Sequence, residues 1–480
     1  MPAANRNTYL WTIVLVAIFM AFCKIGHGDL REWDEARNGE NAYEMVHRGD
    51  FINLYYGGDP DTWNAKPPLL TWLMAASYKT FGFNEFAMRL PVAIAIVLFF
   101  VVLFKLIEVM QDAKTAFACC LILLSCKAIF GLHVGITGDY DAPLLLFLTL
   151  SAYFFFLYVE RRRRYAILLT GVFTGLAFYT KGTASVAYLP GFFLYIIYRR
   201  RLVATLTDPI AWLSAVLFVC IAGSWIWLVM KYGLVTEHSH YGSRNAIETM
   251  LVHDTFRRMS STGFEPVYVP EHFFFFTTLD AKLNLWNYIF YLVVAIGLWL
   301  LYRNRRNLGA YLTSERNRPV IFALCLSLPL SVLLTFATNK HDWYMAPAWA
   351  GIVFILVRGI NYIRSKWRPF LFICLSLLAF TLVRHVAYLV TLPTEMHEFF
   401  SRKNPYFSGN NKIIIVGDPR QNAYLYAKWL GMPMDYAVHL PQDGHKGDIA
   451  ILYTDQLKKD GADKVVPVKY FQDYCVVVYR

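Results

Sequence analysis

The chain has 480 residues, of which 57% are apolar, 17% are aromatic and only 17% are charged. Soluble domains carry roughly 25% charged residues, so this composition excludes an ordinary soluble enzyme and predicts a polytopic α-helical membrane protein. The net charge of +12 does not indicate a nucleic-acid partner, because the Lys and Arg residues cluster between apolar segments, as they do in the cytoplasmic loops of membrane proteins.

Apolar segments recur along the first 394 residues, and we interpret this part of the chain as one membrane domain. Most segments approach the length of about 20 residues that crosses the hydrocarbon core. They lie near 8–26, 90–109, 115–132, 142–160, 165–180, 183–198, 210–230, 284–302, 319–338, 344–360 and 369–391, which predicts about 11 transmembrane helices. We interpret 8–26 as the first of them rather than as a cleaved signal peptide, because no A-x-A-like site follows it.

Basic clusters set the predicted orientation. They lie at 161–164, 199–201, 303–318 and 358–368. With eleven spans and a cytoplasmic N-terminus, all four clusters face the cytoplasm, as the positive-inside rule requires. The same count of spans places four other segments on the outer side of the membrane: residues 27–89, 133–141, 231–283 and the tail. Residues 67–82 are apolar enough to be read as a span. Counting them as one would place every later basic cluster on the outer side of the membrane, so we expect an amphipathic helix on the outer membrane surface.

The tail at 395–480 has a different character. Residues 412–416, 449–453 and 475–479 read as short apolar strands, and 420–430 reads as a helix between the first two. We therefore expect a small α/β extracytoplasmic domain. It lacks the Gly-x-Gly-x-x-Gly pattern, which favours a structural or acceptor-docking role over nucleotide binding.

The first outer loop carries a dense polar group at Asp34, Glu35 and Arg37. On a helix, Asp34, Arg37 and Asn41 would share one face. Such a face can hold a proton-accepting carboxylate beside an anion-binding guanidinium. The alternative is an ordinary polar loop with a helical ion pair.

Two further outer segments contain acids or bases that are costly near a membrane. Asp139 and Asp141 lie between two apolar spans, where an acid facing lipid costs on the order of 3 kcal/mol. We expect them to face a water-filled cavity or a cation, with Asp141 as a helix cap as the alternative. Lys181 lies at another outer turn, where a phosphate partner or snorkelling to the headgroups would each explain it.

Two later outer segments add polar groups. His272 follows an acid and precedes four phenylalanines, so it could contact a metal or substrate, or could simply be an interfacial residue beside an aromatic belt. Lys340 and Tyr344 lie in a polar turn between two spans. Polar groups from several loops thus converge on one membrane face, as a site for a lipid-linked, anionic substrate would require.

The order of these motifs resembles the GT-C superfamily of membrane glycosyltransferases. The resemblance is closest to the bacterial aminoarabinose (lipid A) transferases and extends to the protein O-mannosyltransferases. The matching residues are Asp34-Glu35-x-Arg37, Lys66-Pro67-Pro68-Leu69 with Trp72, Asn84-Glu85-Phe86-Ala87-x-Arg89-Leu90-Pro91, Asp141-x-Pro143, Thr180-Lys181-Gly182, His272, and Lys340-x-x-x-Tyr344-x-x-Pro347.

The resemblance implies inverting transfer of a sugar from a polyprenyl-phosphate donor, such as undecaprenyl phosphate, to lipid A, a glycan or a protein. The reaction would occur at the extracytoplasmic face of the bacterial inner membrane. The implied roles are as follows: Asp34 and Glu35 catalytic; Arg37, Lys66 and Lys181 on the donor phosphate; and Asp139, Asp141, His272, Lys340 and Tyr344 in the donor or acceptor pocket. If the acceptor is a phosphate, no base is needed, and Asp34 would orient it.

The chain departs from the family pattern before Lys66. The family often has an acid there, where this chain has Ala65. A divalent cation held by Asp34, Asp139 or His272 stays open, and no other cofactor is implied. Asn339 stands where a serine is common, so acceptor specificity could differ from lipid A.

Two other functions compete with transfer. A transporter or flippase of a polar lipid would tend to show internal repeats and mid-membrane ionisable groups, and the sequence shows neither pattern. A non-catalytic scaffold presenting the tail would leave the polar loop residues unexplained.

Overall fold

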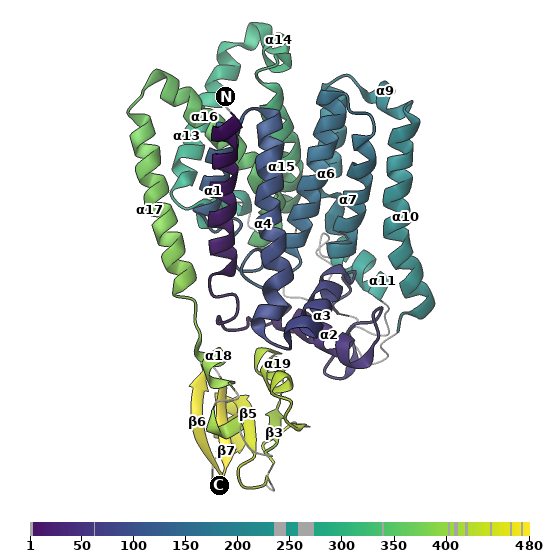
Figure 1. Cartoon of the computed structure of the whole chain (residues 1–480), viewed down its shortest axis with the longest axis vertical. Helices are drawn as coiled ribbons and strands as arrows, with labels where there is room; N and C mark the ends of the chain where they lie inside the picture. The colour runs from purple at the N-terminus through teal and green to yellow at the C-terminus, as the bar shows by residue number, and fades with distance from the viewer. Residues whose placement is uncertain are drawn as a thin grey trace.

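The computed structural model describes residues 3–61, 63–234, 246–257, 273–337, 340–401, 404–407, 411–417, 421–441, 444–460, 463–471 and 474–480. Long helices form a bundle that ends, on one side, in short helices and a small β-sheet (Figure 1). The bundle helices are α1 (Ala3–Phe22), α4 (Glu85–Met110), α5 (Ala113–Leu124), α6 (Asp141–Arg161), α7 (Ala166–Lys181), α8 (Leu189–Tyr198), α10 (Pro209–Tyr232), α13 (Trp286–Arg303), α15 (Arg318–Phe336), α16 (Trp349–Lys366) and α17 (Phe370–Val390).

Shorter helices connect or flank the bundle. They are α2 (Asp34–Arg48), α3 (Leu69–Phe81), η1 (Gly182–Tyr188), α9 (Leu202–Leu206), α11 (Ala246–Glu248), η2 (Thr249–Arg257), α12 (Phe274–Leu283), η3 (Arg305–Asn307), α14 (Leu308–Thr313), η4 (Asp342–Ala348), α18 (Glu395–Phe399), η5 (Pro405–Phe407), α19 (Gln421–Leu430) and α20 (Thr454–Asp460).

The chain is a multi-pass membrane protein. Within the described residues, seven helices are long and apolar enough to cross a membrane, and two shorter apolar helices, Arg6–Phe22 and Ala113–Leu124, accompany them. Length and composition therefore give seven candidate spans among the described residues, and the total of about 11 stays a prediction. Two of the four missing segments are shorter in the structure than predicted: α5 has 12 residues and α8 has 10.

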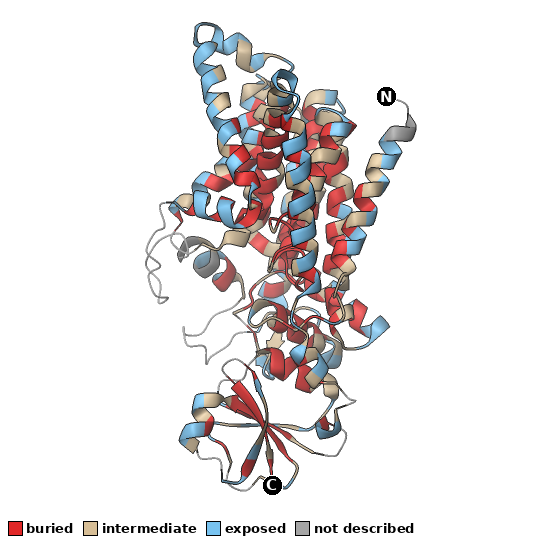
Figure 2. Ribbon diagram, turned by 90° about the vertical axis from the view of Figure 1, so that its left-hand side faces the viewer, coloured by how far each residue is buried: buried red, intermediate tan, exposed pale blue. Residues whose placement is uncertain are grey.

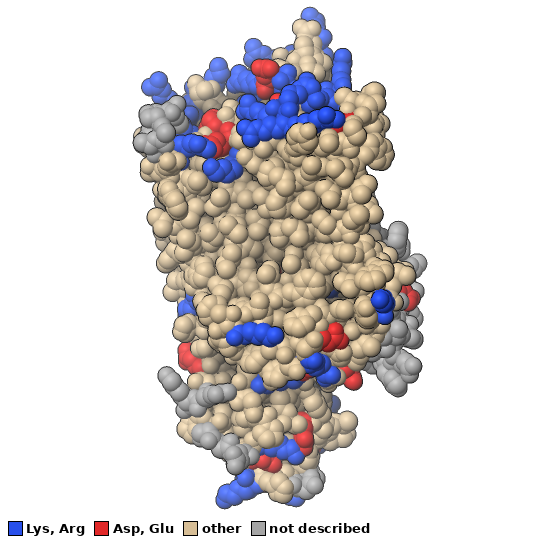
Figure 3. Space-filling model, turned by 45° about the vertical axis from the view of Figure 1, so that its right-hand side comes forward, with Lys and Arg blue, Asp and Glu red and all other residues tan. Residues whose placement is uncertain are grey.

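Charge is distributed unequally between the two ends of the bundle. Lys and Arg side chains gather at the end that carries the N-terminus, above a broad band without charged side chains (Figure 3). Helices α9 and α14, which adjoin two of the predicted basic clusters, lie at this end, whereas α2, α3 and the sheet lie at the other (Figure 1). This distribution is the one that the positive-inside rule predicts.

The first outer loop folds into two helices and a two-residue hairpin, β1 (Tyr55–Tyr56) with β2 (Asp59–Pro60). Helix α2 ends at Gly49, whose φ of 70° places it in the left-handed region that favours glycine. Helix α3 has 13 residues and lies beside α2 at the end of the bundle. It is too short to span, in agreement with the predicted surface helix.

The tail forms a five-stranded mixed sheet in the order β4-β3-β5-β7-β6. The strands are β3 (Ile413–Val416), β4 (Met434–Ala437), β5 (Ile449–Tyr453), β6 (Val465–Phe471) and β7 (Tyr474–Tyr479). The three predicted strands and the predicted helix, α19, are present. Strands β4 and β6 were not predicted, because both lie at sheet edges and expose several of their residues, so neither reads as an apolar run. The domain boundary at residue 395 stays a prediction.

One hydrophobic cluster continues from the bundle into the sheet. It includes Met20 of α1, Phe100 of α4, Leu425 of α19 and Val476 of β7. Buried residues accordingly run through the bundle and along the strands (Figure 2). The tail is thus packed onto the membrane part through the first outer loop.

Candidate active site

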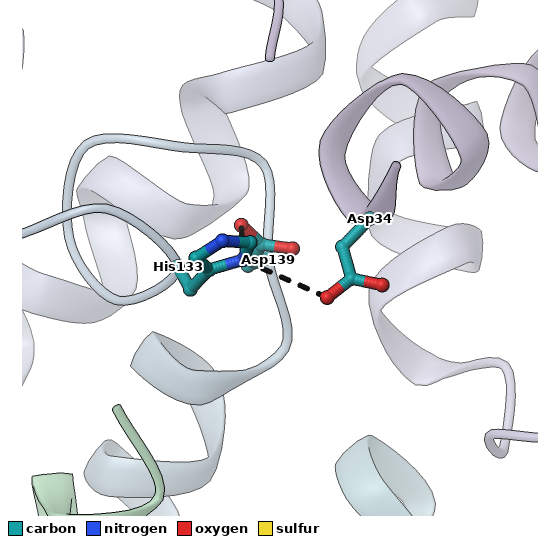
Figure 4. A group of neighbouring side chains, drawn as sticks. All are labelled: Asp34, His133 and Asp139. Carbon is teal, nitrogen blue, oxygen red and sulfur yellow. Dashed lines mark ion pairs between the residues drawn. The ribbon is translucent and has the colours of Figure 1, made fainter. Parts of the chain in front are cut away.

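Three side chains from two outer segments meet at the end of the bundle. Asp34 begins α2, and His133 and Asp139 come from the loop before α6. His133 Nδ1 lies 3.6 Å from Asp34 Oδ2 and 3.5 Å from Asp139 Oδ2 (Figure 4). The side chains of Asp34 and His133 are 50% and 24% exposed and Asp139 is buried, so the group is open toward solvent mainly on the Asp34 side.

The local backbone holds this group in place. Thr137 Oγ1 accepts the His133 N–H at 2.9 Å and donates to Asp139 Oδ2 at 2.6 Å. The His133 ring stacks on Trp343 of η4, with 3.9 Å between ring centroids. Trp33, just before Asp34, and His133 both have positive φ, 63° and 65°. Non-glycine residues in that region store strain, which tends to occur where a site fixes a particular geometry.

The electrostatics of this group favour a cation. Burial raises the pKa of Asp139 well above its ordinary value, and the Asp34 charge adds to this effect. Burial also lowers the pKa of His133, so its ring is neutral at neutral pH. The ligand atoms of Asp34, His133 and Asp139 lie within 4.8 Å of one another, and His133 Nδ1 has no hydrogen-bond partner among the described residues. A neutral imidazole with two carboxylates is a donor set that divalent metals accept.

Glu35 is placed differently from Asp34. It is fully buried and pairs with Arg89 of α4, with 2.6 Å between Arg89 Nε and Glu35 Oε1. It also accepts the backbone N–H groups of Gly138 and Arg31, each at 2.8 Å. Glu35 therefore ties α2 to α4 and to the loop of Asp139, and it lies outside the three-residue group.

Arg37 pairs with an acid that the sequence analysis did not single out. Its Nε and Nη2 donate to Asp61 at 2.7 Å each, and Asn41 donates to the same carboxylate at 3.1 Å. The shared face of Arg37 and Asn41 is thus confirmed, with Asp61 as its partner. Burial raises the pKa of Asp61, but the Arg37 guanidinium outweighs burial, so the pKa lies below its ordinary value.

Lys66 lies in a cleft between the first outer loop and the outer end of α10. Asp61 and Asn64 line the polar side, and Trp225 and Val229 line the apolar side. Lys66 Nζ donates to Asn64 Oδ1 at 3.1 Å, and no carboxylate in the described part of the chain forms an ion pair with it. A cation beside an apolar wall suits the phosphate of a lipid.

Lys181 and Asp141 form a pair at the ends of α7 and α6. Lys181 Nζ lies 2.7 Å and 2.6 Å from the two oxygens of Asp141, and 5.2 Å from the ring centroid of Tyr344. Asp141 therefore pairs with a lysine, and its side chain does not cap α6. This pair brings three predicted residues into one contact.

Two predicted residues lie elsewhere. Lys340 Nζ donates to the carbonyl of Thr335 at 2.8 Å and lies 5.0 Å from the Phe274 ring, at the end of α15. His272 lies outside the described residues. The sequence analysis missed His133 and Asp61. A histidine six residues before Asp139 was a usable signal, whereas no local pattern connects Asp61 with Arg37.

Comparison with known proteins bears on this arrangement. Residues 65–227 match the family model described as dolichyl-phosphate-mannose-protein mannosyltransferase. The undecaprenyl phosphate-alpha-4-amino-4-deoxy-L-arabinose arabinosyl transferase of Pseudomonas savastanoi pv. phaseolicola is 31% identical over 214 residues, 42% of this chain and 39% of that protein. An uncharacterized protein of Aquifex aeolicus is 23% identical over 349 residues, 73% of this chain and 63% of that protein. The aligned regions thus span less than two thirds of these relatives.

Solved structures align with a greater part of this chain than the sequence relatives do. ArnT from Cupriavidus metallidurans bound to undecaprenyl phosphate aligns with 98% of both chains at a TM-score of 0.73 and 15% identity. The chain has the same fold as ArnT. The oligosaccharyltransferase AglB of Archaeoglobus fulgidus aligns with 89% of this chain and 64% of its own at a TM-score of 0.55 and 13% identity. The resemblance to the aminoarabinose transferases that the sequence motifs predict is confirmed.

Proposed function

We propose that the chain transfers a sugar, with inversion, from a polyprenyl-phosphate donor to a lipid, glycan or protein acceptor. The observation that carries the proposal is the Asp34–His133–Asp139 group. Lys66 Nζ lies 5.3 Å from the ring centroid of Tyr140, the residue after Asp139, so this group and the Lys66 cleft adjoin. The similarity to transferases that use undecaprenyl phosphate-linked aminoarabinose supports the donor class.

Lys66 is the residue that we assign to the leaving phosphate. Its ammonium group is free of carboxylate partners in the described chain and can neutralise the charge that develops on the departing polyprenyl phosphate. The apolar wall of the cleft, with Trp225 and Val229, would contact the first units of the polyprenyl chain. Arg37 and Lys181 are paired with Asp61 and Asp141, respectively. Their positive charges are therefore less available to the donor phosphate than the charge of Lys66.

Asp34 is the residue that we assign to the acceptor. It is the exposed carboxylate of the group, so an acceptor hydroxyl can reach it and lose its proton to it. If the acceptor is a phosphate, Asp34 would orient it. The residues that would hold a divalent cation are Asp34, His133 and Asp139. Such a cation, when bound, would supply Lewis-acid polarisation.

The membrane location follows the same argument. The basic residues gather at the end opposite α2 and the sheet (Figure 3). We therefore place the protein in a bacterial inner membrane, with the site and the tail on the periplasmic side.

The test is transfer by purified protein in vesicles with a labelled polyprenyl-phosphate sugar and a membrane extract as the acceptor source. Wild type should release polyprenyl phosphate, and Asp34→Asn should reduce release by about 100-fold or more, since a positioned base contributes that much. Asp59→Asn, an exposed acid of the same loop, should behave as wild type.

Near-normal release by Asp34→Asn would contradict the assigned role. Movement of the labelled lipid across the bilayer without any release would instead favour the transporter alternative.

A further inference from the structure

An open cleft of about 350 Å³ lies at the basic end of the bundle, between the turn that joins α6 to α7 and the turn that joins α9 to α10. Its lining is Tyr158, Arg162, Arg164, Arg201, Ala204 and Asp208. Three guanidinium groups and a single carboxylate therefore border one space. The cleft belongs to the end of the molecule where Lys and Arg side chains gather (Figure 3), whereas α2 lies at the other end.

The carboxylate of the cleft, Asp208, already has its partners. Arg164 Nε and Nη2 donate to Asp208 Oδ1 at 3.0 Å and 2.8 Å, and the hydroxyl of Tyr158 donates to Oδ2 at 3.3 Å. Asp208 Oδ1 also accepts the backbone N–H of Ile210 at 3.0 Å and so caps α10. Its charge is therefore balanced by Arg164 and is not available to the other two arginines.

Arg162 and Arg201 are the lining cations that form no ion pair in the part of the chain that the structure describes. Arg201 Nη1 donates to the backbone carbonyl of Val159 at 2.7 Å, which holds its side chain against the end of α6. The neighbouring acid Glu160 is paired with Arg199. Burial and the positive charge of Arg162 lower the pKa of Arg201. The two guanidinium groups thus repel each other, and an anion in the cleft would remove that cost.

The surroundings of the cleft are those of a membrane surface. Asp208, Trp212 and Val216 follow one another at intervals of four residues, so they lie on neighbouring turns of one face of α10. Trp212 and Val216 are both exposed, and Trp212 Nε1 donates to the backbone carbonyl of Leu206 on α9 at 2.8 Å. Val203 and Leu206 of α9 are exposed as well. Tryptophan residues favour the level of the lipid headgroups, so an apolar face leads from the hydrocarbon region to the cleft.

We propose that this arginine cleft, through Arg162 and Arg201, binds the phosphate of an anionic phospholipid. The planar guanidinium group matches the phosphate oxygens and can donate two hydrogen bonds to them. The acyl chains would follow the exposed face of α10 that carries Trp212 and Val216. A soluble phosphate would meet the same two arginines but would leave this apolar face uncovered, so the lipid is the favoured occupant.

The arginine cleft is separate from the proposed reaction site. Helix α6 has 21 residues and begins at Asp141, whereas the cleft lies beyond its last turn. At about 1.5 Å per residue, roughly 30 Å separates the two ends of this helix. The proposal therefore goes beyond sugar transfer and stands whether or not the chain is a transferase.

The test measures retention of phosphatidylglycerol by native mass spectrometry. The full chain is reconstituted in phosphatidylcholine vesicles that contain phosphatidylglycerol and is then extracted in mild detergent. Wild type should carry one phosphatidylglycerol molecule, and Arg162→Gln and Arg201→Gln should each weaken its retention about tenfold, as expected for the loss of a charge-assisted contact. Arg162→Gln decides the outcome if Arg201→Gln, which also loses its bond to Val159, does not fold.

A neighbour in the same run of arginines provides the matched control. Arg163 is exposed and does not line the cleft, so Arg163→Gln removes the same charge and should retain the lipid as wild type does. Lys66→Gln, which alters the proposed donor cleft, should also retain it. The thermal unfolding midpoint of Arg162→Gln in detergent without lipid should equal that of wild type.

Equal retention by wild type and Arg162→Gln, or no retention by wild type, would overturn the proposal. An equal loss in Arg163→Gln would show that the whole basic end attracts the lipid without a defined site, and a loss in Lys66→Gln would place the lipid in the donor cleft. Displacement by soluble glycerol 3-phosphate at equal concentration would show that the arginines recognise a free phosphate, and would overturn the assignment to a lipid.

Discussion

Arg37 and Asp61 form a largely buried ion pair in the first outer loop. Two hydrogen bonds of 2.7 Å join them, and Asp61 also accepts the backbone N–H groups of Trp63 and Asn64. Asn64 in turn bonds Asn38, Asn41 and Lys66. One carboxylate thus organises the segment that delivers Lys66 to its cleft.

Asp61→Asn should lower the stability of the protein markedly. Removing one partner of a buried pair leaves an uncompensated charge and costs on the order of 3 kcal/mol. We expect a clear fall in the thermal unfolding midpoint in detergent, together with weaker donor binding. Asp59→Asn, which changes an exposed acid of the same hairpin, is the control, and an equal midpoint in the two variants would contradict the prediction.

Lys66→Gln should affect the donor more than the fold. The glutamine side chain keeps a polar group near Asn64 but loses the charge, so we expect the KM for the polyprenyl-phosphate sugar to rise roughly tenfold or more. Lys79→Gln on α3 removes an exposed lysine and should leave KM unchanged. An unaltered KM in Lys66→Gln would contradict the assignment of Lys66 to the donor phosphate.

Divalent cations should bind at Asp34, His133 and Asp139 with an affinity that rises with pH. Burial raises the pKa of Asp139 above its ordinary value, so a cation that binds this carboxylate competes with a proton. Calorimetry in two buffers of different ionisation enthalpy would detect the released proton. Binding with no proton release, or binding that survives in Asp139→Asn, would contradict this assignment.

At the scale of elements, α2 is held between the bundle and α19. A Cβ atom on Gly39 would lie 2.4 Å from Met88 Sδ and 2.6 Å from Leu425 Cδ2, so only glycine allows the two neighbours to approach this closely. Lys428 of α19 pairs with Glu44 and, at 3.0 Å, with Glu40. Helix α19 therefore positions the helix that begins with Asp34.

Glu40→Gln should flatten part of the dependence of stability on pH. Burial raises the pKa of Glu40 to about 7 from an ordinary value of 4.5, although Lys428 opposes the shift. Between these values the folded state binds more protons than the unfolded state, so stability falls as pH rises through this window. Glu40→Gln removes that loss.

The measurement is the thermal unfolding midpoint from about pH 5 to about pH 8. The wild-type midpoint should decline more steeply than that of Glu40→Gln. Glu315→Gln, an exposed acid at the opposite end of the molecule, should follow wild type. Parallel curves for wild type and Glu40→Gln would contradict the assignment.

At the scale of the whole molecule, hydropathy and charge predicted the architecture well. Apolar length and the positions of Arg clusters are local properties. They indicated the helical bundle, the gathering of basic residues at one of its ends, and a helix, α3, that is too short to span a membrane. The three buried strands of the tail were found for the same reason, because every residue of β3 is apolar and buried. The edge strands β4 and β6 depend on neighbours distant in sequence and were missed.

The site was predicted less completely than the fold. Asp34, Asp139, Lys181 and Asp141 stood out because charged residues between apolar spans are conspicuous. Their partners did not: Arg37 meets Asp61, and His133 meets Trp343, across separations that no local pattern records. The role of Glu35 as a tether likewise emerges only once α4 brings Arg89 beside it.

The packing of α19 against α2 also has a consequence for the order in which the protein folds during synthesis. The ribosome delivers α2 early, but α19 lies almost four hundred residues later, as the Lys428–Glu40 contact shows. Until α19 has been synthesised and has reached the end of the bundle that carries α2, Gly39 and Glu40 lack their second packing surface. A chain still in translation would therefore carry Asp34 on a loosely held helix, and the proposed sugar transfer would begin only after the tail has packed against α2.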